Sequence, residues 1–210
     1  MRCCLKFGHY EQDNNLDNGK EVIEWLVLDY DSVNNRVLLL SRYGLDAKPY
    51  NTEYDDVTWE KCTLRTWLNG EFINNAFSTV EQGSILTMTV DNSKDQGYWD
   101  INGGNNTQDK IFLLSSAEAN KYLGVTYEDR INMKSRTSPT IYALQAGTWT
   151  CDYYKTLDGT AAGWWWLRSP GSFHDTAAYV NFDGSIDACS VVFSSACRPA
   201  LWINLESELF

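Results

Sequence analysis

The sequence predicts a mixed α+β fold, with short helices in the N-terminal two-thirds of the chain and an antiparallel hairpin near its C-terminus. Three observations support this prediction: helix-capping patterns, the turn dipeptide Asp183-Gly184 between two apolar runs, and no internal repeat or linker in the 210 residues. A chain of this length buries a substantial core without disulfides or metal ions. We therefore expect one domain, residues 1–210.

The first expected element is a β-hairpin. The runs EVIEWLVLDY (21–30) and NRVLLLSRY (35–43) are apolar and rich in residues that favour strands, and polar residues at 31–34 favour a turn between them. The segment 59–68 follows, with apolar residues spaced as on one helical face. Asn69-Gly70 is expected to end this helix.

Three further short helices are predicted from their first residues. Ser78 to Glu81 and Ser115 to Glu118 have the capping-box spacing, in which each side chain bonds the other residue's backbone. Ser138 is expected to cap a third helix, with Pro139 in its first turn and Gly147 beyond its end. The run IFLLS (111–115) is expected to form a strand before the second of these helices.

The segment 91–109 consists largely of residues that favour turns, and we expect a long ordered loop. It contains enough side-chain oxygens for a calcium site, but its spacing is not that of an EF-hand. It also lacks the Glu-Pro-Asn and Trp-Asn-Asp motifs of sugar-binding C-type lectins. A solvated acidic loop is the preferred interpretation, and no metal or cofactor is expected.

The C-terminal hairpin is predicted to have Asp183-Gly184 as a two-residue loop, so that Phe182 faces Ser185. Side chains then alternate between two faces. One face is small and apolar, as for packing on a core: Ile186, Ala188, Ser190 and Val192. The other is chemically mixed, as for exposure to solvent: Phe182, Asp187, Cys189, Val191 and Phe193. Val180 falls on the mixed face, which fits this register poorly.

Charge and composition exclude several functions. With 17 basic and 28 acidic residues the net charge is -11, which repels phosphate backbones, so nucleic acid is not an expected partner. No window is apolar enough for a membrane span, and the first ten residues lack the apolar core of a signal peptide. Membrane insertion is not expected, and the location is expected to be cytoplasmic or phage-associated unless another route exports the chain. The six cysteines show no zinc-site spacing.

Seven segments, in order, resemble a bacterial domain family of unassigned function over nearly the whole chain. They are FGHYEQD, EWLVLD, PYNTEYDDVTWEKCTLRTWLN, TQDKIFLLSSAEANKY, WWWLRSPG, AAYVNFDGSI and RPALWIN. That family in turn resembles the C-type-lectin-like fold, in the variant shared by formylglycine-generating enzymes and the variable proteins of diversity-generating retroelements. The resemblance implies a fold of this type with a ligand surface near the C-terminal end of the domain.

The resemblance also implies a function. In retroelement variable proteins of this fold, an aromatic scaffold holds a C-terminal segment whose exposed side chains are rewritten. Here 164–170 and 198–204 bracket a corresponding segment, 171–197. The expected role is non-catalytic display of this segment to a protein or other macromolecule. The expected ligand-binding residues are Phe173, His174, Asp175, Phe182, Asp187, Cys189, Val191, Phe193, Ser194, Ser195 and Ala196.

Two alternatives remain open. A cysteine-dependent oxidase of the formylglycine-generating type needs a reactive thiol pair, and Cys189 and Cys197 have only Arg198 nearby in the sequence to activate them. A glycan-binding lectin needs a fixed site, usually with a metal. The three tryptophans 164–166 offer aromatic surface for sugar stacking, but we expect at least two of them to be buried. Arg168 is expected to pair with a carboxylate inside the domain.

Overall fold

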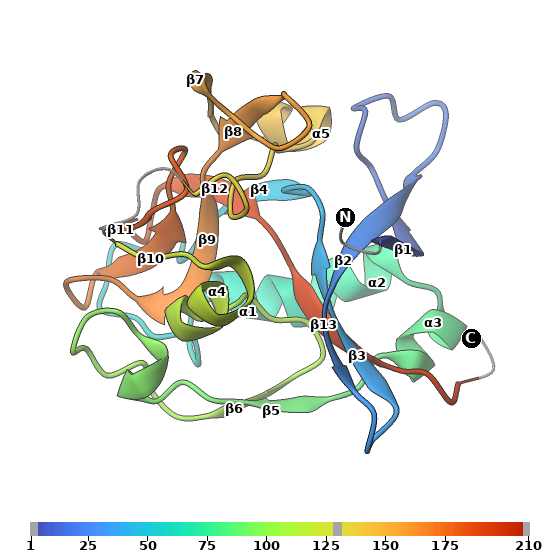
Figure 1. Ribbon diagram of the computed structural model, residues 1–210, viewed down its shortest axis with the longest axis horizontal. Helices are drawn as coiled ribbons and strands as arrows, with labels where there is room; N and C mark the ends of the chain where they lie inside the picture. Colours follow the sequence, from blue (N-terminus) through green and yellow to red (C-terminus); the bar gives the residue numbers. More distant parts are fainter. Residues whose placement is uncertain (1–3, 128–131, 208–210) are drawn as a thin grey trace.

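The computed structural model describes residues 4–127 and 132–207, and it confirms the mixed α+β fold (Figure 1). Strands predominate, the helices are few and short, and the sheets are almost entirely antiparallel. No helix in the described part of the chain has the length and apolar character that crossing a membrane requires. The longer-range organisation rests on two sheets, of four and of five strands.

The four-stranded sheet joins the N-terminal strands to the last strand of the chain, in the order β1-β2-β3-β13. Its antiparallel strands are β1 (Cys4–Tyr10), β2 (Glu21–Asp31), β3 (Arg36–Ser41) and β13 (Ala200–Asn204). The predicted hairpin is thus confirmed as β2 and β3. Because β13 pairs with β3, the C-terminal motif RPALWIN is anchored beside residues from the beginning of the chain.

The five-stranded sheet has the order β11-β10-β9-β12-β4 and contains most of the C-terminal segment. Only the β9 to β12 pairing is parallel. The strands are β4 (Asp46–Pro49), β9 (Trp165–Pro170), β10 (Thr176–Val180), β11 (Ile186–Ser190) and β12 (Ser194–Cys197). Strand β11 therefore lies at one edge of the sheet, and β4 lies at the other.

The helices are short segments, and in the view of Figure 1 α1, α2 and α4 appear between the two large sheets while α5 appears at the top. Their bounds are α1 (Thr63–Trp67), the π-helical η1 (Leu68–Phe72), α2 (Ile73–Ala76), α3 (Thr79–Ser84), the 3₁₀ helix η2 (Lys94–Gln96), α4 (Ser116–Leu123) and α5 (Ile141–Gln145). Both predicted capping boxes are present, at Ser78 with Glu81 and at Ser115 with Glu118.

Three local predictions are corrected. The helix expected to end at Asn69-Gly70 continues through η1 and α2, and the Asn69 side chain, in place of ending the helix, bonds the distant backbone of Lys110 and Ile111. The cap of α5 is Thr140, not Ser138; the Thr140 hydroxyl accepts from the Ala143 amide. The run 111–115 makes one isolated bridge instead of a strand.

Two small ribbons complete the described structure. Strands β5 (Met88–Val90) and β6 (Thr107–Asp109) pair with each other, so the last three residues of the predicted loop form a strand, and the loop between the strands, 91–106, contains η2. Strands β7 (Thr150–Lys155) and β8 (Ala161–Gly163) form a ribbon beside α5, where the chain projects at the top of Figure 1.

Aromatic side chains form much of the core that supports the C-terminal segment. Trp165 and Trp166 are fully buried, as expected for at least two of the three tryptophans, and one buried cluster includes members of both large sheets. The Trp166 indole N–H donates to the Lys48 carbonyl at 3.0 Å, and its ring meets that of Tyr50 at 5.8 Å. The motif WWWLRSPG is therefore mainly structural.

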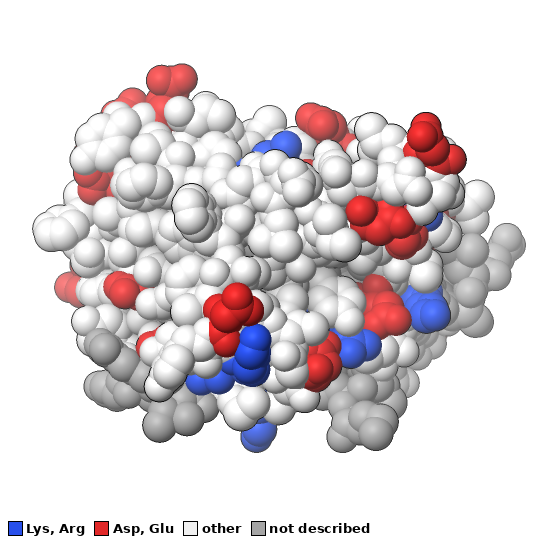
Figure 2. Space-filling view, turned by 90° about the horizontal axis from the view of Figure 1, so that it is seen from above, with Lys and Arg blue, Asp and Glu red and all other residues white. Residues whose placement is uncertain are grey.

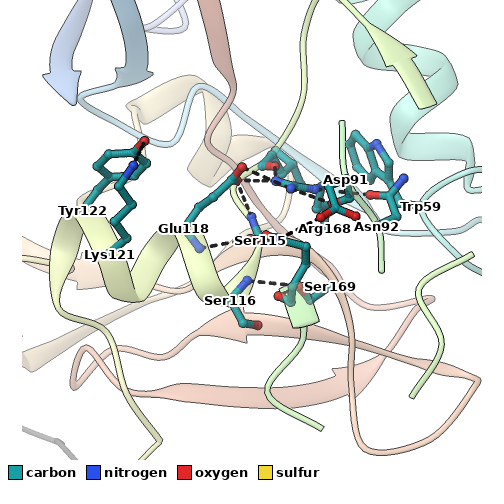
Figure 3. A network of polar contacts seen from close by, with 12 residues as sticks. Trp59, Asp91, Asn92, Ser115, Ser116, Glu118, Lys121, Tyr122, Arg168 and Ser169 are labelled. Atoms are coloured by element: carbon teal, nitrogen blue, oxygen red, sulfur yellow. Dashed lines mark hydrogen bonds and ion pairs between the residues drawn. The ribbon is translucent and has the colours of Figure 1, made fainter. Parts of the chain in front are cut away.

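A buried arginine follows these tryptophans and links three parts of the chain (Figure 3). Arg168 is 2% exposed and pairs with the carboxylate of Glu118, the residue that also completes the cap of α4. Its guanidinium donates to the carbonyls of Leu113 at 2.9 Å and Asp91 at 3.0 Å, and to the Asn92 side chain. The prediction of an internal carboxylate partner for Arg168 is confirmed.

A second buried arginine, Arg198, opens the motif RPALWIN. Its guanidinium lies over the Trp165 ring, 4.8 Å from the ring centroid, and donates to the Ser41 carbonyl at 2.8 Å. Arg198 thus joins the end of β3 to the core of the five-stranded sheet. The two motifs that bracket segment 171–197 are each fixed by a buried, multiply bonded arginine.

We predict a large difference in stability between this scaffold and the segment it supports. Trp166→Ala should lower the free energy of unfolding by about 3–5 kcal/mol, because it leaves a cavity in a packed core. Ser194→Thr, at a half-buried strand position, should change it by about 0.5 kcal/mol or less. Urea denaturation followed by circular dichroism measures both, and equal losses would contradict the division into scaffold and surface.

Candidate functional site

Three chain connections meet at one end of the five-stranded sheet. Strand β4 pairs antiparallel with β12, which places Pro49 opposite Ser194. Strand β11 precedes β12 in the chain and pairs with β10, which places Ser190 opposite Thr176. The connections β4 to α1, β9 to β10 and β11 to β12 therefore leave the sheet on the same side. We call residues 50–57, 171–175 and 191–193 the three-loop end.

Backbone hydrogen bonds tie these loops to one another. The Asn51 amide donates to the Val191 carbonyl at 2.9 Å, and the Val191 amide donates to the Asp175 carbonyl at 3.1 Å. The Val57 amide donates to the His174 carbonyl at 3.1 Å. These bonds between the loops use main-chain atoms, and side chains such as Thr176, whose hydroxyl accepts from the Phe173 amide at 2.9 Å, add bonds within them.

The three-loop end exposes several large side chains. Phe173 is 68% exposed, Phe193 57% and Tyr54 69%, while His174 is also exposed. The Tyr54 hydroxyl donates to the Asp175 carboxylate, and this hydrogen bond raises the pKa of Tyr54. Exposed aromatics on a fixed backbone are typical of residues that anchor an interface.

A small cavity opens beside His174. It has a volume of about 130 Å³ and lies between the loop after β4, the loop near residue 101 and the loop after β9. The lining residues are Asp56, Val57, Thr58, Lys61, Ile101, Asn102, Pro170 and His174. Pockets for drug-sized ligands usually measure about 300–1,000 Å³, whereas an engineered cavity of about 150 Å³ binds benzene. This cavity matches one side chain in size.

The structure brings only some of the sequence-predicted ligand residues to this end. Phe173, His174, Asp175 and Phe193 lie in its loops, and Ser194 follows directly as a half-buried residue. The exposure expected of three other residues is corrected, because Ser195 and Ala196 are buried within β12 and Val191 turns into the core after β11.

Phe182, Asp187 and Cys189 do not join this surface. Phe182 lies in the turn at the opposite end of β10 and β11, half-buried, with its ring 6.3 Å from that of Trp164. Asp187 and Cys189 lie on the edge strand β11, both half-buried. The predicted residues are therefore spread from the three-loop end, along β11, to the turn at its other end.

The hairpin register also differs from the prediction by one residue. Val180 faces Ile186, and the Asn181 amide donates to the Ser185 carbonyl, so Phe182 does not face Ser185 as predicted. The loop therefore contains three residues, Phe182, Asp183 and Gly184. Gly184 has φ +91°, as in three-residue loops with glycine in the left-handed region. The new register pairs Val180 with apolar Ile186, which removes the poor fit seen in the sequence.

The two cysteines of the C-terminal segment are not activated thiols. Burial raises the pKa of Cys189 to about 12, and complete burial raises the pKa of Cys197 well above its ordinary value. Both therefore remain protonated at neutral pH, whereas nucleophilic and redox-active cysteines need an accessible thiolate.

Among residues 4–127 and 132–207, one group of acidic side chains lies close enough together to hold a metal ion. Carboxylate oxygens of Glu11, Asp13 and Glu21 lie within 4.8 Å of one another. Backbone amides already bond these groups, as when the Gln12 amide donates to Glu21 at 2.7 Å. The cluster belongs to the loop between β1 and β2, whereas sequence analysis considered calcium only at 91–109.

A second exposed apolar region was not found from the sequence. It lies on α5 and the β7 to β8 ribbon, and its large exposed side chains are Ile141, Leu144, Trp149, Tyr153 and Leu157. Figure 2 shows the face on which these elements project; much of its middle is uncharged, and acidic side chains lie mostly toward its edges. In the sequence these residues are scattered among polar ones over 141–157, where the sequence analysis predicted only a short helix.

Comparison with known families gives one match. A family model described as a domain of unknown function (DUF6273) matches residues 34–205, which is well over half of the chain. No curated protein and no solved structure matches the chain.

We predict that Cys189 and Cys197 resist alkylation in the folded protein. Iodoacetamide at pH 7.5 should modify the exposed Cys4 first, since Cys197 is buried, Cys189 is half-buried, and burial raises the pKa of both thiols. Peptide mass spectrometry reads out each site, and urea should make all three react. Modification of Cys189 or Cys197 faster than Cys4 without urea would indicate an activated thiol.

We also predict that the hairpin turn depends on Gly184. A Cβ at this position would lie 2.1 Å from the Asn132 carbonyl oxygen, whereas Gly159, with φ +83°, has nothing within 4 Å of an added Cβ. Gly159→Ala should cost about 1 kcal/mol through backbone strain alone. Gly184→Ala should cost about 3 kcal/mol, because overpacking adds to that strain. Equal changes in urea denaturation would contradict the observed turn.

Proposed function

We propose that this chain, which belongs to the DUF6273 family, is a non-catalytic binding module that presents its three-loop end to a macromolecular partner. The observation that carries this proposal is that the backbone at that end is hydrogen-bonded while several large side chains there are exposed. The loops are joined by main-chain hydrogen bonds, while Phe173, Phe193 and Tyr54 remain largely exposed. Such a surface is ordered before binding, which lowers the entropic cost of association.

We further propose that the fold is C-type-lectin-like, of the formylglycine-generating type, and that the chain resembles retroelement variable proteins in function. The burial of both flanking motifs supports this proposal, because segment 171–197 then lies between two fixed supports. Within that segment, residues 173–175 and 193–194 are the proposed contact residues. Phe182 lies in the turn at the other end of the sheet, and Asp187 and Cys189 lie along the edge strand β11, so none of the three has an assigned part in the same contact.

Catalysis by cysteine is the less favoured function. The oxidase alternative needs a thiolate pair, whereas burial keeps Cys189 and Cys197 protonated. The lectin alternative, in its usual metal-dependent form, draws no support from the three-loop end, since the carboxylate group at Glu11, Asp13 and Glu21 lies in the β1 to β2 loop.

Diversification has a genetic test that is independent of binding. We expect a reverse transcriptase gene near the coding sequence, with a near-copy of the DNA for residues 171–197 that differs at adenines. Substitutions should concentrate at codons 173–175 and 192–194, whose side chains are accessible, and should spare Val191 and Ala196, which are buried. Variation that falls equally on the buried codons would contradict the display proposal.

We predict that two phenylalanines anchor the partner. With a partner captured by affinity purification, Phe173→Ala and Phe193→Ala should each weaken binding by more than about 1 kcal/mol, or roughly fivefold in Kd. Tyr153→Ala is the matched control, because Tyr153 is 85% exposed on β7 and lies outside the three-loop end.

Isothermal titration calorimetry gives the three Kd values, and thermal denaturation checks that Tm is nearly unchanged in each variant. Binding should also persist in EDTA. Normal affinity in both phenylalanine variants would contradict the proposed surface, and loss of binding in EDTA would favour the metal-dependent lectin.

A further inference from the structure

We infer that the partner presents a basic side chain, Lys or Arg, to the cavity at the three-loop end. This inference deepens the proposed function and rests on it. The surface offered to the partner combines exposed aromatic rings, a cavity of single-side-chain size and unpaired carboxylates. Each of these features favours a cationic group with an apolar stem, and together they specify the chemistry of the contact.

The first argument is the size and lining of the cavity. Its volume of about 130 Å³ suits one side chain, and Val57, Ile101 and Pro170 give it apolar walls. Asp56 supplies a carboxylate to the same lining. Long basic side chains bury an aliphatic stem along apolar surface while the charged head remains near water or a counter-ion. Because Lys61 balances Asp56 in the lining, the apolar walls favour a long stem, and the sign of its head group is decided by the acidic side chains around the cavity.

The second argument is charge complementarity around the cavity. Glu53, Asp55 and Asp56 are all exposed on the loop after β4, and none of them forms an ion pair with another described residue. Several acidic side chains elsewhere do form ion pairs, as Asp31 does with Arg36. An acidic surface repels acidic partners and accelerates encounter with basic ones.

The third argument is the exposed aromatic rings beside these carboxylates. Tyr54 belongs to the same loop, and Phe173 is followed in the chain by His174, which lines the cavity. A cation placed over an aromatic face gains about 0.5–1 kcal/mol at an exposed site. Aromatic and acidic groups therefore act on the same ligand, a cation, whereas an anion would be repelled by both.

Lys61 makes the inference sharply testable, because it is the only Lys or Arg in the cavity lining. It is exposed and has no ion pair with the described residues. Its ammonium group opposes a cationic ligand and would assist an anionic one. Removing the charge of Lys61 and removing that of Asp56 must therefore have opposite effects, and the ligand's charge decides which variant binds more tightly.

The experiment uses fluorescein-labelled Gly-Ser peptides that contain either three arginines or three glutamates. Fluorescence anisotropy at about 50 mM salt gives Kd for the unaltered protein and for Asp56→Asn, Lys61→Gln and Asp17→Asn. Asp17 is an exposed acid in the β1 to β2 loop, so its variant matches the change in net charge away from the cavity.

We expect the arginine peptide to bind more tightly than the glutamate peptide. Asp56→Asn should weaken its binding about threefold and Lys61→Gln should strengthen it about threefold, as for single partly screened charges. Asp17→Asn should change Kd by less than about 1.5-fold. Equal effects of Asp56→Asn and Asp17→Asn would mean attraction by net charge alone and would overturn the inference.

Preference for the glutamate peptide, tighter binding by Asp56→Asn, or no binding of the arginine peptide would also overturn it. The proposed function fails differently, through normal partner affinity in Phe173→Ala and Phe193→Ala. If those variants lose affinity while the peptides show no charge preference, the proposed binding surface is supported and the inference of a basic partner is wrong.

Discussion

The buried guanidinium of Arg168 is the constraint on which the arrangement of the C-terminal half depends. It pairs with Glu118 and bonds the backbone of Leu113 and Asp91, so one charged group holds β9, α4 and the start of the 91–106 loop together (Figure 3). Removal of one partner from such a buried pair typically costs about 3–5 kcal/mol, because the other charge remains without compensation. The bonds of Arg168 therefore determine how β9, α4 and the 91–106 loop are placed relative to one another. Strand β9 thus has a fixed position from which the following loops extend.

Because buried arginines fix the flanking motifs, the residues that hold the fold are distinct from the exposed residues of segment 171–197. Arg168 and Arg198 fix the two motifs on either side of the C-terminal segment, and neither side chain reaches the surface. The loops between them are held by main-chain bonds, including that from the Val191 amide to Asp175. Exposed side chains such as Phe173 consequently contribute little to folding and are available for contact. A binding module with changeable specificity needs this division, because its contact residues must vary without loss of the fold.

Local signals in the sequence predicted local structure well. The capping box at Ser115 needs only residues within four positions, and both of its hydrogen bonds are present. The Asp183-Gly184 turn was located correctly, but its register was not, because the loop packs against the remote Asn132 and Ser135. Asn69 was misjudged for a similar reason, since its side chain bonds a distant loop. Non-local contacts decided each of these positions.

The candidate site was harder to predict than the fold, because it joins segments more than 100 residues apart. Segment 171–197 was identified, yet nothing in the sequence showed that the loop containing Tyr54 lies beside it or that a cavity opens between them. Alternation along a strand also gave the wrong exposure for Val191, which follows β11 and turns into the core. Sequence patterns describe one element at a time, whereas this surface is produced by the meeting of three loops.

The central claim is that main-chain bonds fix the three-loop end independently of its surface side chains. Amide hydrogen exchange tests it most directly, in a variant with Phe173, His174, Val192 and Phe193 all replaced by serine. The account predicts that the amides of Asn51, Val57 and Val191, which donate the bonds between the loops, keep the protection seen in the unaltered protein. Loss of protection at these three amides, with the sheets still protected, would show that the surface side chains hold the loops and would contradict the account.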